Sequence, residues 1–262
     1  MFGFKPSLNN FGNVDVKKFQ VSNTLLALAA PNSNQSQYII PNSVPIFNQG
    51  SLNTCVPNSC CAALEILNQL GTGSFSNLSR LFLYWNSRME SQETNQDSGT
   101  YIHYCLDSLK KLGVCDEQLW IYDASLLYAQ PNILSYKQAN SNLIADFFQI
   151  ENDGSENMLG QIELSIRSNH CVVFGCAVDN SLLTYNGSNG VFNAPQQENI
   201  KGMHALTIIG VRINNGQREF LIRNSWGSGW GMSGCVWFSS EYMTDPNTSD
   251  IFVLTKMNNL MA

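Results

Sequence analysis

Cys55 is the residue whose type and position are best suited to chemistry. It follows a polar loop that begins with Gln49-Gly50, and Pro57 comes just after it. Proline is tolerated in the first helical turn because its missing N–H has no partner there. The spacing therefore predicts a helix that starts at Cys55, with the Thr54 hydroxyl as its N-cap. A thiol at a helix N-terminus is favoured as thiolate by the helix dipole, so Cys55 is a candidate nucleophile.

The other seven cysteines are read as structural. Cys60 and Cys61 fall inside the predicted helix, where free cysteines behave as small buried hydrophobes. Cys171 and Cys176 lie in one apolar run at an odd offset, which places them on opposite faces of a strand. Since no C-x-x-C or H-x-x-x-H spacing occurs, no metal and no cofactor are expected.

A nucleophilic thiol needs a base and a group that orients the base. Of the 3 histidines, His103 lies in a predicted helix and is read as a structural or surface residue. His170 opens an apolar strand and is read as structural. His204 opens a second apolar strand, where it can face a cleft. Downstream, the carbonyl of Asn224 could accept from an imidazole N–H and Trp226 could shield that bond. The pattern predicts a site built from Cys55, His204 and Asn224.

Composition narrows the function classes. The chain has 262 residues, 44% of them hydrophobic, and a formal net charge of -6. An acidic chain without a basic run is not expected to bind nucleic acid. No apolar stretch is long enough to cross a membrane, and the first residues lack the pattern of a signal peptide. An intracellular or particle-associated protein is expected unless a leader has been removed, and the compartment is otherwise undetermined.

Helical patterns precede strand patterns, which predicts an α+β fold. Residues 1–42 are read as an N-terminal extension, either a strap across the body or a pro-like segment, and residues 43–262 as one domain. The domain divides into a helical lobe over about 43–150 and a sheet-rich lobe over about 151–262. Helices are predicted from residue 55, over 78–89, over 99–112 and over 156–169, and 131–148 is read as a connector. Strands are predicted over 171–178, 205–213, 219–223, 234–239 and 251–254, with a hairpin turn at 214–216.

Three motifs in order carry a family resemblance. They are Gln49-Gly50-x4-Cys55, His204-Ala205 and Asn224-Ser225-Trp226-Gly227. Together they resemble the papain-like cysteine peptidases, to which the cathepsins belong. The likeness runs from about residue 43 to the C-terminus and is greatest to the bacterial, archaeal and viral members.

The resemblance implies a two-lobed fold and hydrolysis of peptide bonds through a covalent acyl-enzyme. Cys55 in the helical lobe would be the nucleophile, paired as thiolate with the imidazolium of His204 in a β-barrel-like lobe. Asn224 would orient His204, and Gln49 would donate to the oxyanion with the Cys55 N–H.

The family also implies substrate contacts. Main chain near Gly99 would pair with an extended protein or peptide substrate, Ala205 would lie beside a side-chain pocket, and Trp226 would cover the His–Asn bond. Residues 1–42 could block the cleft. The protein is expected to be a monomer.

Two residues depart from the family pattern. Leu52 stands where animal and plant members have a disulfide-forming cysteine, and Val56 replaces a large aromatic residue. An endopeptidase is the leading interpretation. An exopeptidase with one end of the cleft blocked and a catalytically silent peptide-binding homologue are the alternatives.

Overall fold

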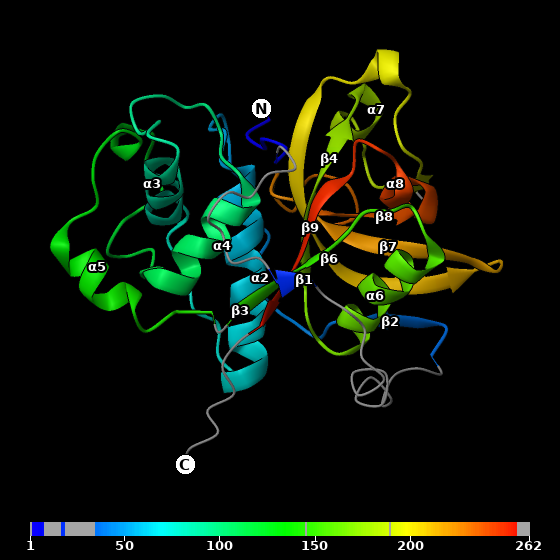
Figure 1. Cartoon of the computed structure of the whole chain (residues 1–262), viewed down its shortest axis with the longest axis horizontal. Helices are drawn as coiled ribbons and strands as arrows, with labels where there is room; N and C mark the ends of the chain where they lie inside the picture. Colours follow the sequence, from blue (N-terminus) through cyan, green and yellow to red (C-terminus); the bar gives the residue numbers. More distant parts are fainter. Residues whose placement is uncertain (1, 8–16, 19–34, 145, 189, 256–262) are drawn as a thin grey trace.

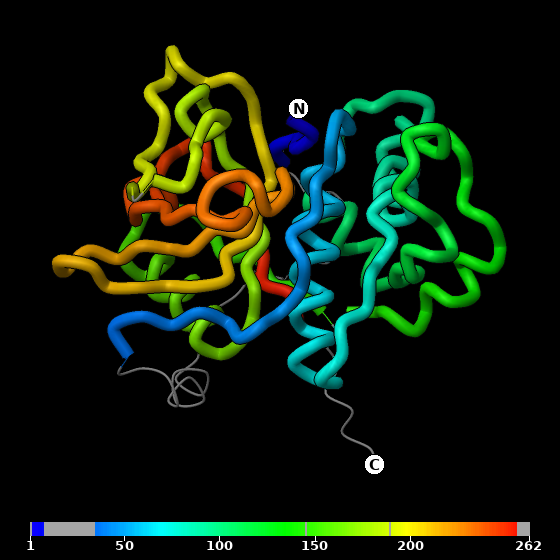
Figure 2. Tube along the Cα trace, turned by 180° about the vertical axis from the view of Figure 1, so that it is seen from behind, coloured from blue at the N-terminus to red at the C-terminus, as the bar shows by residue number. Residues whose placement is uncertain are grey.

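The computed structural model describes residues 2–7, 17–18, 35–144, 146–188 and 190–255, and it has two halves (Figure 1). One half gathers most of the helices, and the other is built on a curved sheet (Figures 1 and 2). The helical elements are α2 (Cys55–Thr72), α3 (Arg80–Glu90), α4 (Ile102–Lys111), η2 (Ala124–Leu126), α5 (Ile133–Ala139), α6 (Glu156–Arg167), α7 (Asn180–Leu183), η3 (Gln197–Asn199) and α8 (Ser240–Thr244). The strands are β1 (Lys17–Lys18), β2 (Gln37–Ile39), β3 (Asp146–Ile150), β4 (Val172–Val178), β5 (Val191–Phe192), β6 (Gly202–Asn214), β7 (Gln217–Arg223), β8 (Cys235–Ser239) and β9 (Ser249–Thr255).

The sheet is organised around β6. Within the described residues the strands follow the order β1-β3-β9-β4-β6-β7-β8-β5, with β2 paired to β6 off this path. The pairs that involve β4, β6, β7 and β9 are antiparallel, while β1–β3 and β5–β8 are parallel. All seven residues of β4 are buried, because helices and neighbouring strands cover both of its faces. The predicted α+β class is confirmed.

Helix α2 joins the two halves. Its side chains are buried continuously from Cys55 to Asn68, as is typical of a helix surrounded by protein. The Thr207 hydroxyl of β6 donates to the Ser59 carbonyl of α2 over 3.1 Å, which ties the sheet to the helix near its start. The first residue of α2 therefore faces the boundary between the halves.

The hairpin turn between β6 and β7 forms as predicted. Asn215 and Gly216 adopt φ values of 50° and 79°, the left-handed region that a two-residue hairpin requires. The other predicted helices and strands also occur, with ends displaced by a few residues.

Three expectations from the pattern were wrong. The Thr54 side chain does not cap α2, because its hydroxyl is hydrogen-bonded to Tyr122 Oη. The predicted connector over 131–148 contains α5 and the start of β3; α5 escaped detection because Ile133 and Leu134 are 66% and 61% exposed and break the apolar period. Strands also begin before residue 170, since β2 and β3 both belong to the sheet.

No helix among the described residues is both long and apolar enough to span a membrane.

Candidate active site

Cys55 lies at the first residue of α2 and is 0% exposed. Its thiol is within hydrogen-bonding reach of the backbone of Ala205 in β6 and of Gly3 in the N-terminal segment. The thiol therefore sits at the boundary of the two halves, beside the residue that follows His204.

His204 is held by Asn224. The imidazole Nε2 and Asn224 Oδ1 are 2.9 Å apart, and the Ser225 backbone N–H donates to the same Asn224 atom over 2.8 Å. A backbone N–H can only donate, so the atom it contacts is the amide oxygen, and His204 Nε2 must carry the proton of this bond. In the neutral ring Nδ1 then holds the lone pair, and this atom makes no hydrogen bond with the described residues. The arrangement is that of a base with a free lone pair.

Trp226 covers this hydrogen bond. Its ring is stacked on the His204 imidazole with a centroid distance of 4.7 Å and an interplanar angle of 27°. Trp230 packs edge-on against Trp226 at 5.2 Å, and its indole N–H donates to the Leu182 carbonyl over 3.1 Å. The aromatic pair excludes water from the His204–Asn224 bond, and such a bond is stronger in a medium of low dielectric constant.

Gln49 is joined to the same network. Its side chain is 1% exposed; Nε2 donates to the Leu52 carbonyl over 2.9 Å, and Oε1 accepts from Ser225 Oγ over 2.7 Å. The Gln49 backbone N–H also donates to the Ser225 carbonyl over 2.8 Å. Ser225, for which no role was predicted from the sequence, thus connects Gln49 to Asn224. Its signal in the sequence was its position inside the Asn224–Gly227 motif.

Residues 2–7, which we call the strap, lie between the two halves and over Cys55 (Figure 1). The strap runs parallel to the chain at Thr100: the Thr100 N–H donates to the Gly3 carbonyl over 2.8 Å, and the Lys5 N–H donates to the Thr100 carbonyl over 3.0 Å. The family resemblance implied main-chain pairing of this type, with a substrate, near Gly99. Here Thr100 makes the main-chain bonds, while the Gly99 N–H is bonded to the Tyr84 hydroxyl.

Aromatic side chains of the strap fill the site. The Phe2 ring lies edge-on to the His204 imidazole with centroids 6.4 Å apart. The Phe4 ring is 4% exposed and approaches Gly175 so closely that a Cβ at Gly175 would lie 2.0 Å from the ring. Glycine at this position of β4 leaves the space that the Phe4 ring occupies.

The strap is anchored to both halves at its far end. Ser7 Oγ is hydrogen-bonded to His103 Nδ1 of α4 over 2.9 Å, and the Ser7 N–H donates to Asp250 Oδ2 of β9 over 2.9 Å. Lys5 forms an ion pair with Glu93. His103, read from the sequence as a structural or surface residue, is therefore a contact of the strap.

Burial under the strap dominates the electrostatics of the site. Desolvation raises the pKa of the Cys55 thiol to about 11, although backbone hydrogen bonds from Ala205, Gly3 and Val56 act in the opposite direction. Desolvation also lowers the pKa of His204 to about 4, partly opposed by the bond to Asn224. The sequence predicted a thiolate favoured by the helix dipole. In the covered site the thiol and the imidazole are instead both neutral at pH 7.

Two further expectations bear on substrate binding and metals. The Ala205 side chain is 0% exposed, and its backbone contacts the Cys55 thiol. All eight cysteines are free. In the part of the chain that the structure describes, no group of three His, Cys, Asp or Glu side chains could hold a metal ion.

Comparisons with known proteins agree with this geometry. The family model of the papain family cysteine proteases matches residues 36–251. An uncharacterized peptidase C1-like protein of Acanthamoeba polyphaga mimivirus is 28% identical over 228 residues, which cover 84% of this chain and 72% of that protein. Procathepsin L of Felis catus is 26% identical over 242 residues, 89% of this chain and 68% of that protein. In fold, the chain resembles xylellain, a cysteine protease from Xylella fastidiosa, with a TM-score of 0.82, 24% identity and coverage of 98% and 96% of the two chains.

The fold and the family match define a papain-like cysteine protease. The chain belongs to the papain family of cysteine proteases.

Proposed function

We propose that the protein is an endopeptidase in which Cys55 attacks the substrate carbonyl and His204 removes the thiol proton through Nδ1. The observation that carries the proposal is the pair of bonds to Asn224 Oδ1, because they leave the His204 lone pair on Nδ1. His204 then protonates the leaving amine, a covalent acyl-enzyme forms at Cys55, and water releases it with His204 again acting as base.

Gln49 is proposed as the oxyanion donor. An amide nitrogen has two N–H donors, and one of them is used on the Leu52 carbonyl. The other N–H, with the backbone N–H of Cys55, would stabilise the negative oxygen of the tetrahedral intermediate. Ser225 and Leu52 hold the Gln49 amide from both ends, so little reorganisation is needed when charge develops.

We further propose that the strap blocks the cleft and that the substrate takes its place along Thr100. An extended peptide would bond to the N–H and carbonyl of Thr100, as Gly3 and Lys5 do. On displacement of the strap water reaches the site, the desolvation of Cys55 and His204 is relieved, and the thiolate–imidazolium pair can form.

Replacement of the nucleophile tests the chemistry. Cys55→Ala is expected to abolish peptide hydrolysis and labelling by a thiol-reactive epoxide. Cys235→Ala is the matched control, because Cys235 is a partly exposed free thiol that belongs to none of the three motifs, and it should preserve both activities. Unchanged hydrolysis in Cys55→Ala would contradict the proposal.

A long peptide blocked at both ends separates the modes of cleavage. An endopeptidase cuts it internally, and mass spectrometry identifies the fragments. Absence of internal cuts, with release of single residues or dipeptides from unblocked peptides, would assign an exopeptidase. Absence of any cleavage by a protein whose Cys55 can be alkylated would favour a silent peptide-binding homologue.

The role of the strap is tested at Gly3. A Cβ there would lie 1.9 Å from the Asn53 carbonyl oxygen, so Gly3→Ala should displace the strap. Overpacking typically costs about 1–3 kcal/mol, and we expect hydrolysis to increase by about 5-fold or more. Gly71→Ala is the control, since a Cβ at Gly71 meets no atom within 4 Å. Equal or lower activity in Gly3→Ala would argue against blocking.

A further inference from the structure

Two main-chain segments of the helical half enclose the strap at Gly3. A Cβ on Gly3 would lie 1.9 Å from the Asn53 carbonyl oxygen, and a Cβ on Gly99 would lie 2.2 Å from the Gly3 carbonyl oxygen. The gap between Asn53 and Gly99 therefore admits a peptide backbone and little more. Asn53 lies two residues before Cys55, and Gly99 precedes Thr100. The width of this gap therefore sets the separation between the Cys55 loop and the main chain at Thr100, which would pair with an extended peptide.

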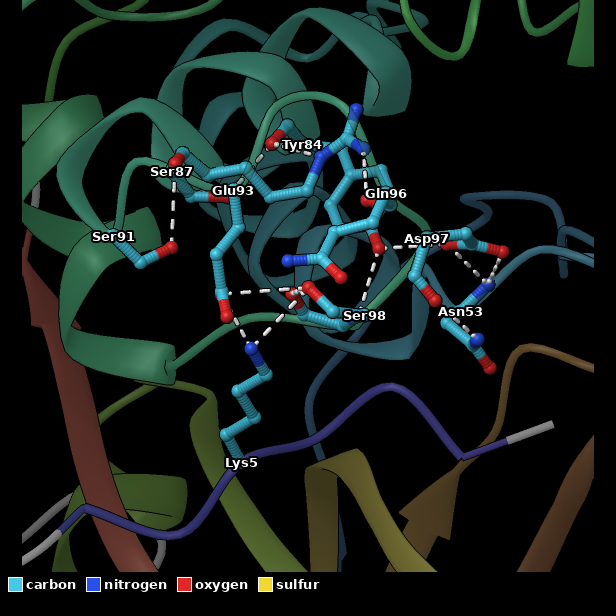
Figure 3. Close-up of polar contacts among 11 residues, drawn as sticks. Lys5, Asn53, Tyr84, Ser87, Ser91, Glu93, Gln96, Asp97 and Ser98 are labelled. Carbon is cyan, nitrogen blue, oxygen red and sulfur yellow. Dashed lines mark hydrogen bonds and ion pairs between the residues drawn. The ribbon is translucent and has the colours of Figure 1, made fainter.

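Asp97 ties the first segment to the second. The Asn53 backbone N–H donates to both carboxylate oxygens of Asp97 over 3.2 and 3.1 Å, and Asn53 Nδ2 donates to the Asp97 carbonyl over 2.8 Å. Figure 3 shows the Asp97 carboxylate between Asn53 and the Tyr84 hydroxyl. Bonds to a carboxylate are stronger than bonds between neutral groups, so this contact restrains the loop that leads to Cys55.

Tyr84 continues the link to Gly99. Its hydroxyl donates to Asp97 Oδ1 over 2.7 Å and accepts from the Gly99 N–H over 2.9 Å. The side chain is 0% exposed, and burial together with the bond to Asp97 raises the pKa of the Tyr84 hydroxyl, which keeps it protonated as a donor. The chain of bonds runs from Asn53 through Asp97 and Tyr84 to Gly99.

Arg88 packs against this chain of hydrogen bonds. Its guanidinium lies over the Tyr84 ring at 4.0 Å and donates to the carbonyl of Gln96, the residue before Asp97, over 2.7 Å. Arg88 is 0% exposed and also donates to the Leu127 carbonyl over 2.6 Å. Because all eight cysteines are free, no disulfide cross-links the two segments.

We infer that Asp97 and Tyr84 are positioning residues that set the spacing between the loop of Cys55 and the main chain at Thr100. Their effect is expected with extended peptides, which must reach Cys55 and the main chain at Thr100 at the same time. A substrate that occupies only the position next to the scissile bond does not use Thr100 and does not depend on them. The inference rests on the proposed peptidase function.

The test compares two substrates in the full-length protein. One is an extended peptide amide with several residues before the scissile bond, and the other is a single blocked residue with the same leaving group. The strap lowers kcat/KM for both substrates by the same factor, because each needs the open cleft. The ratio of the two kcat/KM values is therefore independent of how often the strap opens.

The variants are Tyr84→Phe, Asp97→Asn and the double variant. A displacement of about 1 Å can cost about 100-fold in rate, so we expect the ratio of extended to short substrate to fall by at least about 10-fold in each single variant. The double variant should fall no further than the worse single variant, because both residues belong to one chain of bonds. Tyr136→Phe and Asp107→Asn are matched controls: Tyr136 loses a hydroxyl bond to Asn86, and Asp107 loses an ion pair with Lys111. Their ratios should stay at the wild-type value.

A ratio within 2-fold of wild type in both single variants would overturn the inference. Equal losses on both substrates with a lower Tm would also overturn it, since that result describes general destabilisation. If neither the wild-type protein nor Gly3→Ala hydrolyses either substrate, the proposed function fails and the positioning role fails with it.

Discussion

At the scale of single residues, the protonation state of the His204 imidazole depends on the Asn224 side chain and on the backbone N–H of Ser225. The Ser225 N–H identifies the acceptor on Asn224 as oxygen, and this places the His204 proton on Nε2. A base whose proton and lone pair are assigned in this way needs no rearrangement before it accepts the thiol proton.

Asn224→Ala should remove this control of the tautomer. General base catalysis contributes about 100- to 10,000-fold, and loss of its orientation is expected to reduce kcat by about 10- to 100-fold. The hydrogen bond to Asn224 raises the pKa of His204, so the variant should also lower that pKa further. Nitrogen NMR of the imidazole reports both the tautomer and the pKa. An unchanged tautomer with unchanged kcat would exclude the role.

The reactivity of Cys55 should follow the burial of its thiol. The pKa is raised to about 11, so the thiol is protonated at pH 7 and the reactive thiolate increases as the pH rises toward 11. We expect the rate of alkylation of Cys55 by iodoacetamide to climb throughout pH 7–10 in the wild-type protein. In Gly3→Ala the same profile should move to lower pH, because water enters the site. An identical profile in both proteins would refute the link between the strap and the thiol pKa.

At the scale of elements, a buried ion pair joins α2 to α3. Arg80 donates to both carboxylate oxygens of Glu65 over 2.5 and 2.6 Å, and the two side chains are 2% and 0% exposed. The Leu78 N–H adds a third bond to Glu65 over 2.9 Å. Helix α2 presents Cys55, so this pair helps to hold the nucleophile relative to the helical half.

Glu65→Gln should leave the guanidinium of Arg80 buried without its counter-charge. Breaking a buried pair typically costs about 3–5 kcal/mol, and we expect the free energy of unfolding in urea to fall by that amount. Glu156→Gln is the control, since Glu156 is 83% exposed in its ion pair with Arg218 and should change stability by less than about 1 kcal/mol. Equal effects of the two variants would contradict the importance of burial.

At the scale of the whole molecule, the strap connects the two halves. It pairs with Thr100 in the helical half, contacts His204 and Gly175 in the sheet half, and ends on Asp250. Figure 3 shows the Lys5 side chain reaching from the strap to Glu93 and Ser98, next to the chain of bonds at Asp97. Opening of the strap must break contacts with both halves.

Lys5→Ala should favour the open state. The side chains of Lys5 and Glu93 are 22% and 27% exposed, and a pair so exposed contributes up to about 1 kcal/mol. We therefore expect Cys55 alkylation at pH 8 to accelerate by about 2- to 5-fold in Lys5→Ala and in Glu93→Gln, with little further gain in the double variant. Added salt should have the same effect on the wild type. No acceleration in either variant would show that this ion pair does not hold the strap.

The sequence by itself determined the thiol at the start of a helix, the order of the motifs and the α+β class. These depend on local signals: Pro57 in the first turn, the 3.6-residue period, and the strand and hairpin patterns. The structure brought Cys55, His204, Asn224 and Gln49 to one boundary between the halves.

Only the tertiary structure decided how the site is covered and positioned. The pKa of the Cys55 thiol is raised, whereas the helix dipole alone predicts that it is lowered. The difference comes from burial under residues far away in sequence, which a local argument from the helix dipole cannot include. Thr100 and Asp97 likewise gain their roles from main-chain contacts with Gly3 and Asn53. Their side-chain types alone do not distinguish them from other polar loop residues, because long-range packing determines which backbone groups meet.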